Sequence, residues 1–168
     1  MSTPLFEIRR TTEDDWQDVR TLRLEMLADT PIAFGETRND ALGHDETEWR
    51  MRGARGTAEH GIALAAIDES GRWIGGMGAY TVPPGEPILV GVYVTPDHRG
   101  ADAGVTDALL SAVEDWARTR SDVLTLHVHE DNERARAYYE KRGYALTGDA
   151  LPYELDPGKL NVQMAKPL

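Results

Sequence analysis

The sequence contains no cysteine, which excludes disulfide bonds, thiolate metal sites and a cysteine nucleophile. It has no apolar run near the roughly 18 residues that a membrane span requires. Its first ten residues, "MSTPLFEIRR", lack the apolar core of a signal peptide. These absences favour a cytoplasmic protein with no membrane partner.

Basic residues are scarce in this chain. Lys and Arg number 18 against 29 Asp and Glu, which gives a formal net charge of -11. Nucleic-acid binding draws on clustered Lys and Arg, so we expect no nucleic-acid partner. If the charge balance reflects a ligand at all, it favours a cationic small molecule.

The apolar pattern predicts the order of the elements. The length of 168 residues fits one domain over residues 1–168. Alternating or continuous apolar runs predict strands at 5–10, 62–68, 73–80, 87–95, 122–130 and 161–167. Helical spacing predicts helices after "TTEDD", capped through Thr11 or Thr12, within "DETEWRMR", after Gly104, and in "NERARAYYEKRGY", where Gly143 ends the helix.

This order predicts an α/β fold with a mixed, mostly antiparallel central sheet of about seven strands and helices on both faces. The strand at 87–95 is nearly all apolar, which predicts a central strand buried on both faces. Together with the next helix and the strand at 122–130 it forms one unit, so the two strands should be parallel with a right-handed crossover. A ligand is then expected at the carboxyl end of the first strand, beside "TPDHRGADAG".

Two blocks of residues carry a resemblance to a known family. The first is "VTPDHRG", then Gly104 and "ALLSAVEDWAR"; the second is "DNERARAYYEKRGY", with Asn132, Ala135, Tyr139, Gly143 and Tyr144 at its key positions. Together they resemble the GNAT superfamily of acyl-CoA N-acyltransferases, of the bacterial GCN5-related type. "LRLEMLADTPIAFGET" is similar to the N-terminal helices of many bacterial members, so the resemblance spans nearly the whole chain.

The resemblance implies a function and its partners. It implies a single GNAT-like N-acetyltransferase domain that uses acetyl-CoA as co-substrate, acetylates a primary amine of a small molecule by direct attack, and forms a homodimer. The acidic composition weakly favours a cationic amine as this acceptor. A catalytically silent acyl-CoA-binding or sensor module, and a transferase of a longer acyl group, are the alternatives. No His or carboxylate spacing indicates a metal site.

The resemblance assigns cofactor binding to the loop and helix start at Arg99, Gly100, Ala101, Ala103, Gly104 and Val105. A helix N-terminus supplies several N–H donors and a partial positive charge of about half a unit to a pyrophosphate. Asp102 departs from the family pattern. Either it replaces the middle glycine of the motif, or the loop is two residues longer and Gly104 is that glycine. Counting back from Leu109 and Leu110 favours the longer loop.

The resemblance also places the pantetheine along the backbone of Val92, Tyr93 and Val94, where an N–H polarises the thioester carbonyl. Tyr139 stands at the family's position for the donor to the leaving thiolate. The ordinary pKa of a phenol, about 10, exceeds that of a thiol, so Tyr139 is expected to act by hydrogen bonding. Its neighbour Tyr138 is expected to face the core.

The general base has three candidates. Glu86 precedes the strand at 87–95, while His127 and His129 share one face of the next strand by its period of two. Half-exposed polar positions are the favoured interpretation of the two histidines, so the base is assigned to Glu86. Asn132 either bonds the cofactor or caps its helix, and these roles are compatible. Lys141 and Arg142 either reach CoA phosphates or form a solvated helix end.

By the same resemblance, the region of Phe34 and the turn at 83–86 border the acceptor pocket.

Overall fold

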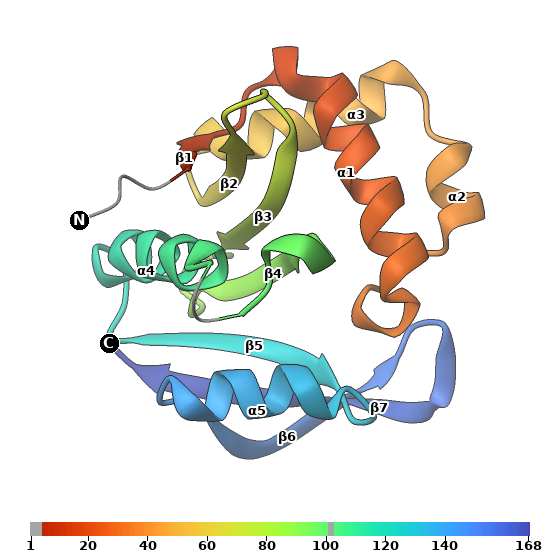
Figure 1. Cartoon of the computed structure of the whole chain (residues 1–168). Helices are drawn as coiled ribbons and strands as arrows, with labels where there is room; N and C mark the ends of the chain where they lie inside the picture. Colours follow the sequence, from red (N-terminus) through yellow and green to blue (C-terminus); the bar gives the residue numbers. More distant parts are fainter. Residues whose placement is uncertain (1–4, 101–102) are drawn as a thin grey trace.

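A seven-stranded sheet organises the chain (Figure 1). The computed structural model describes residues 5–100 and 103–168. The strand order is β1-β2-β3-β4-β5-β7-β6, and the neighbours are antiparallel except for β4 and β5, which run parallel. The strands are β1 (Phe6–Arg10), β2 (Gly61–Asp68), β3 (Trp73–Tyr80), β4 (Ile88–Val94), β5 (Val123–His129), β6 (Ala145–Tyr153) and β7 (Asp156–Pro167).

Helices cover both faces of the sheet, as predicted. They are α1 (Trp16–Asp29), α2 (Arg38–Leu42), α3 (Glu46–Ala54), α4 (Val105–Arg118) and α5 (Glu133–Lys141). Successive residues of β2 separate the two faces, since Leu64 packs with α4 while Ala65 packs with α1 and α3. Tyr139 of α5 belongs to the same cluster as α4, so α4 and α5 cover one face and α1 and α3 the other.

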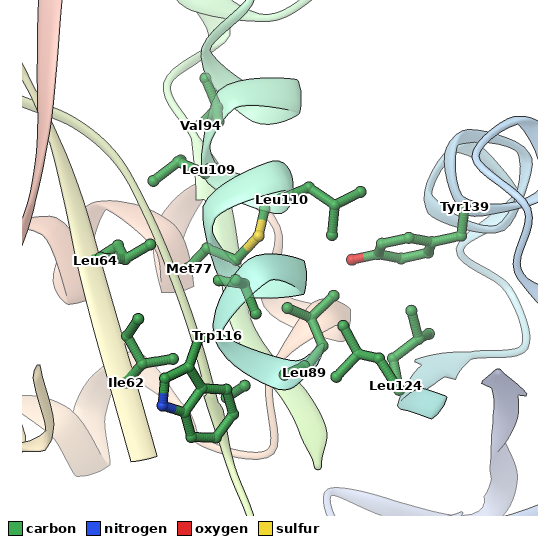
Figure 2. Close-up of a cluster of buried hydrophobic side chains, with 14 of the residues drawn as sticks. Ile62, Leu64, Met77, Leu89, Val94, Leu109, Leu110, Trp116, Leu124 and Tyr139 are labelled. Atoms are coloured by element: carbon green, nitrogen blue, oxygen red, sulfur yellow. The ribbon is translucent and has the colours of Figure 1, made fainter. Parts of the chain in front are cut away.

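The core on the α4 face is the larger of the two clusters. Leu109 and Val113 of α4 are fully buried against the sheet, as the helical spacing of their apolar residues predicted. Figure 2 shows Tyr139 reaching from α5 toward Leu110 and Leu124, so the second sequence block packs onto the first. This packing joins α5 to the strand-helix-strand unit.

Local signals explain where the first helices begin and end. The Thr12 N–H donates to the Asp15 carboxylate at 2.8 Å, while the Thr11 hydroxyl donates to the Gly53 carbonyl at 2.7 Å. The predicted cap is therefore Thr12, and Thr11 instead ties β1 to α3. Helix α1 ends at Asp29, two residues before Pro31, which cannot donate to a helical hydrogen bond.

The structure corrects the sequence prediction in four places. Strand β6 and the five-residue helix α2 were not predicted, and β7 begins at Asp156, ahead of the expected start at 161. Strand β4 is central but is not buried on both faces, because Val90 is 39% exposed. Its apolar middle faces a cavity. Among residues 5–100 and 103–168, no helix is long and apolar enough to span a bilayer.

Candidate functional site

Strands β4 and β5 separate in the middle of the sheet. They pair only at Ile88 with Thr125 and at Leu89 with Leu126, whereas β4 pairs with β3 as far as Val94. From Gly76 to Gly78 the β3 strand advances by two residues, while its partner β4 spans three, from Tyr93 to Val90. This extra residue in β4 is a β-bulge. Gly91 lies within it at φ 61°, a backbone conformation that favours glycine. The bulge turns β4 away from β5.

The separation leaves one edge of β4 without a strand partner. Thr95 N–H donates to the Ile74 carbonyl of β3 at 2.8 Å. Because backbone groups alternate sides along a strand, the N–H and C=O of Val94, and those of Val92, lie toward the opposite edge. Arg99 Nε donates to the Val94 carbonyl at 2.8 Å, so Arg99 folds over this edge. Val92 and Val94, which the sequence comparison assigned to pantetheine binding, thus lie on an open strand edge.

Tyr93 lies on the other side of the strand. Its side chain is buried in the cluster with α1, and its hydroxyl has no hydrogen-bond partner within the described part of the chain. Burial, together with the nearby Glu25 and Asp29 carboxylates, raises the pKa of Tyr93 to about 12. The Arg99 guanidinium lies 5.5 Å from the centre of its ring. Tyr93 therefore helps to position Arg99.

A cavity of about 370 Å³ occupies the gap between β4 and β5, and we call it the first cavity. Residues 89–94 of β4 and 126–129 of β5 form its walls, and both α4 and α5 contribute side chains. Of the residues predicted to bind cofactor, it brings together Val92, Tyr93, Val94, Arg99, Gly100, Asn132 and Tyr139. The two sequence blocks thus meet at one site.

The start of α4 reaches the same cavity at Thr106 and Asp107. Gly100 and Gly104 have φ of 104° and 71°, and Gly104 is the cap residue of α4. Val105 is buried in the core and Ala103 packs against it, so neither side chain lines the cavity. The predictions for Ala101 and Asp102 lie outside the described residues.

Asp107, in the first turn of α4, is a site residue that the sequence did not single out. Its carboxylate accepts from the Tyr138 hydroxyl at 2.7 Å and from Arg142 Nε at 2.5 Å, and all three residues line the first cavity. The bond from Arg142 lowers the pKa of Asp107. Because Arg142 lies 35 positions away, no local pattern could have indicated this pair.

The two tyrosines of α5 differ in environment. Tyr139 is 6% exposed, and burial raises its pKa well above its ordinary value. Within the described residues its hydroxyl has no hydrogen bond to protein, although its side chain lines the first cavity. Tyr138 is only half-buried and is engaged by Asp107, which differs from its expected place in the core. Of the two α5 tyrosines, Tyr139 is the one whose hydroxyl is not engaged by another described residue.

A second cavity, of about 960 Å³, lies beneath α1 and α3. Both cavities are lined by Ala33, Phe34, Leu89, Val90, Gly91 and His127. They therefore meet where β4 and β5 begin to separate. The Phe34 region borders both, whereas the turn at 83–86 lines neither.

The wall at Phe34 is held by a distant part of the chain. The Tyr153 hydroxyl, at the end of β6, is 3.0 Å from the Phe34 carbonyl and 3.3 Å from the Pro31 carbonyl. These contacts fix the short turn between α1 and α2 against the hairpin of β6 and β7.

The three base candidates fall in different places. His127 lines both cavities and is half-buried. His129 lines only the first cavity, is 4% exposed, and accepts the Asp131 N–H at Nδ1 over 3.0 Å. Glu86 is exposed and lines neither cavity. The structure thus brings His127 to the junction and leaves Glu86 outside it.

The remaining polar residues take clear positions. Asn132 caps α5, accepting the Ala135 N–H at 3.3 Å, and also lines the first cavity. Arg142 lines the first cavity, whereas Lys141 lies outside it. Among the described residues, no group of three or more His, Asp or Glu side chains is arranged to hold a metal ion.

A comparison with protein-family models identifies the family. A sequence model of the acetyltransferase (GNAT) family matches residues 16–144. A search of curated proteins gave no significant match.

Several solved structures share the fold. A GCN5-related N-acetyltransferase from Kribbella flavida has a TM-score of 0.76 and 19% identity over 99% of this chain and 100% of that one. The PaiA N-acetyltransferase from Thermoplasma acidophilum, solved in complex with coenzyme A, has a TM-score of 0.71 and 16% identity over both full chains. A ribosomal-protein-alanine N-acetyltransferase from Brucella melitensis has a TM-score of 0.73 and 22% identity over 96% and 99% of the two chains.

The matched range contains the separated strands, the glycine-bearing loop and Tyr139. The chain therefore belongs to the GNAT family of acetyltransferases.

Proposed function

We propose that this protein transfers an acetyl group from acetyl-CoA to a primary amine of a small molecule by direct attack. One observation supports this most strongly: the two cavities meet at Leu89–Gly91 and His127, where β4 and β5 separate. Two reactants entering from the two cavities would meet there. Membership of an acetyltransferase family supports the choice of acetyl-CoA.

The first cavity is the proposed site of acetyl-CoA. The open edge of β4 presents the N–H groups of Val92 and Val94 to an extended amide-bearing chain such as pantetheine. At the start of α4 the first N–H groups have no helical partner and carry the positive end of the helix dipole. Gly100 and Gly104, with positive φ, let the backbone turn toward an anion there, as a pyrophosphate requires.

The chemistry follows from the sides on which the groups lie. The amine lone pair attacks the thioester carbonyl carbon, and the resulting oxyanion is stabilised by an N–H on the open edge of β4. The carbon–sulfur bond then breaks, and the electron pair leaves on the CoA sulfur. Tyr139 belongs to the α4 face, while the second cavity lies beneath α1. The amine thus approaches from one side of the sheet, and the thiolate is stabilised on the other.

Tyr139 is proposed as the hydrogen-bond donor to the departing thiolate. Burial raises the pKa of its phenol, so the proton stays on oxygen, and the hydroxyl stabilises the sulfur charge without being consumed. This agrees with the role that the family resemblance implied.

His127 is proposed as the base that removes the amine proton, directly or through water. It lines both cavities, and its place on β5 puts it beside the junction. We prefer it to Glu86, which lies outside both cavities.

Thiol release from acetyl-CoA with a mixed panel of primary amines tests the proposal. If the protein is an acetyltransferase, the rate of thiol release should fall about 10- to 100-fold in Tyr139→Phe, with little change in the KM for acetyl-CoA. Tyr138→Phe is the matched control, since its hydroxyl is engaged by Asp107, and it should lose much less.

Other outcomes would select the alternatives. CoA binding measured by calorimetry, with no thiol release from any amine, would identify an acyl-CoA-binding or sensor module. Faster thiol release from an acyl-CoA with a longer chain would identify that compound, and not acetyl-CoA, as the donor. A single domain over residues 1–168, a homodimer and a cytoplasmic location complete the proposal; sizing chromatography and cell fractionation test the last two.

A further inference from the structure

The wall of the second cavity carries three arginines: Arg23 of α1, Arg52 of α3, and Arg55 in the turn that follows α3. We infer that the amine acetylated by this protein also carries an anionic group, in the simplest case a carboxylate, which Arg55 and Arg23 bind. This inference rests on the proposed function, because it assigns the second cavity to the acceptor.

The carboxylate that balances these arginines is that of Glu36, and both of its oxygens already accept hydrogen bonds. Glu36 Oε1 accepts from Arg23 Nε at 3.0 Å and from Arg52 Nη1 at 3.0 Å. Its Oε2 accepts from Arg52 Nη2 at 2.9 Å and lies 2.7 Å from His44 Nε2. Arg52 Nε donates to Glu48 at 2.9 Å, and Arg52 Nη2 also lies 3.1 Å from His44 Nε2. Arg52 is therefore satisfied as a structural residue.

Arg23 is only partly engaged. Its Nε is bound by Glu36, and its guanidinium lies 5.1 Å from the centre of the Phe34 ring. Its two terminal nitrogens make no hydrogen bond with the described residues. Since Phe34 lines both cavities, Arg23 stands near the place where the two meet.

Arg55 has no counter-ion among residues 5–100 and 103–168. No carboxylate lies within 4.0 Å of it, and its side chain makes no hydrogen bond there. The Arg55 side chain is exposed at the second cavity, where partial desolvation and the charge of Arg52 lower its pKa. Because its guanidinium is bound by no protein group among the described residues, it can bind an anionic group of a molecule that enters the cavity.

The rest of the second cavity offers little to a cation. Its one acidic lining residue is Glu59, whose side chain is 88% exposed, and the other walls are largely apolar, including Leu22, Met26 and Phe34. A polyamine would bring its charge against guanidinium groups. The net charge of -11 favoured a cationic acceptor, but that charge is spread over the surface and screened within about 10 Å. The lining, which meets the acceptor, favours the opposite sign.

The test compares amino acids with the amines obtained by removing their carboxylate. Thiol release from acetyl-CoA is measured for the twenty amino acids, their decarboxylated amines and their carboxamides, with 2-aminoethylphosphonate and spermidine added. We expect kcat/KM for the best amino acid to exceed that of its decarboxylated amine by at least about 10-fold. The phosphonate distinguishes a carboxylate site from a phosphate site.

Variants assign the effect to the arginines. Arg55→Gln should lower kcat/KM for the carboxylate-bearing amine about 10- to 100-fold and leave the decarboxylated amine nearly unchanged, and Arg23→Gln should act in the same direction. Arg50→Gln is the control, because Arg50 lies on α3 but pairs with Glu46 and lines neither cavity. Circular dichroism and thermal unfolding verify that each variant folds.

The outcomes separate this inference from the proposed function. Turnover with spermidine or uncharged amines above all anionic ones would overturn the inference while the acetyltransferase proposal stands. Equal losses with both members of a pair in Arg55→Gln would also overturn it. No thiol release with any amine would count against the proposed function itself.

Discussion

His127 is the residue whose position decides the choice of base. Sequence reasoning assigned the base to Glu86 and kept His127 and His129 as further candidates, because strand period gives the face of a residue but not the cavity behind that face. Only the separation of β4 and β5 opens the junction that His127 lines.

Replacing His127 with Asn should lower kcat/KM for the amine about 10- to 100-fold, since the amine proton then has no positioned acceptor. The KM for acetyl-CoA should change little. Glu86→Gln is the control and should leave both constants near those of the unmodified protein. Steady-state kinetics with saturating acetyl-CoA measures this, and a large loss in Glu86→Gln alone would reverse the assignment.

At the scale of elements, the bulge in β4 creates the site. Gly91 has φ 61°, and a Cβ built there would meet nothing within 4 Å, so any side chain is opposed by backbone conformation and not by crowding. The bulge therefore depends on a single glycine.

Gly91→Ala should cost about 1–2 kcal/mol in stability, because alanine is disfavoured in this region. It should also raise the KM for acetyl-CoA, because relief of the strain realigns the open edge. Gly71→Ala is the matched control: Gly71 has φ 88° in the turn between β2 and β3, is equally uncrowded, and lines neither cavity. Both variants should lose similar stability in urea unfolding, and only Gly91→Ala should lose activity.

Glu36 joins the three N-terminal helices into one wall. It receives bonds from α1 and α3 and from His44 between α2 and α3. Burial alone would raise its pKa, but the bonds from Arg52, His44 and Arg23 outweigh burial and lower the pKa to about 2. The unfolded chain, with an ordinary value of about 4.5, binds a proton more readily.

Stability from Glu36 is therefore fully present above about pH 5 and is lost as pH falls toward 2. Glu36→Gln should lower the free energy of unfolding at pH 7 by about 2 kcal/mol and flatten its decline between pH 5 and 3. Glu46→Gln removes an exposed pair with Arg50 and should cost less than about 0.5 kcal/mol. An unchanged acid slope in Glu36→Gln would contradict the assignment.

The elements also show how much of the fold could be predicted from the sequence. Helix α4 was predicted well because its buried residues recur at helical spacing and its start carries glycines. Strand β6 was missed because eight of its nine residues are exposed, so burial leaves no alternation to detect. The family motifs located the first cavity, but the arginines of the second converge from separate helices, and no spacing within "ETEWRMRGAR" predicts that.

At the scale of the whole molecule, one sheet runs through every part of the chain. A single domain should unfold in one transition. Trp49 and Trp73 belong to the core on the α1 face and Trp116 to the core on the α4 face, so tryptophan fluorescence reports both.

Unfolding followed by fluorescence and by far-ultraviolet circular dichroism should therefore give coincident curves. Acetyl-CoA at about 100 times its Kd should add about 2.7 kcal/mol and raise the Tm by about 5–10 °C. Two separated transitions would contradict the single domain proposed for residues 1–168.

The bond from Tyr153 to Phe34 has a consequence for the timing of synthesis. The two residues are 119 positions apart. Phe34 therefore cannot make this contact until Tyr153 has been synthesised, much later. At ordinary elongation speeds the delay is roughly 6 to 24 s. A nascent chain that already holds the whole of residues 16–144 still lacks the clamp on Phe34. The wall at Phe34 thus gains this contact only when almost the entire protein has been made.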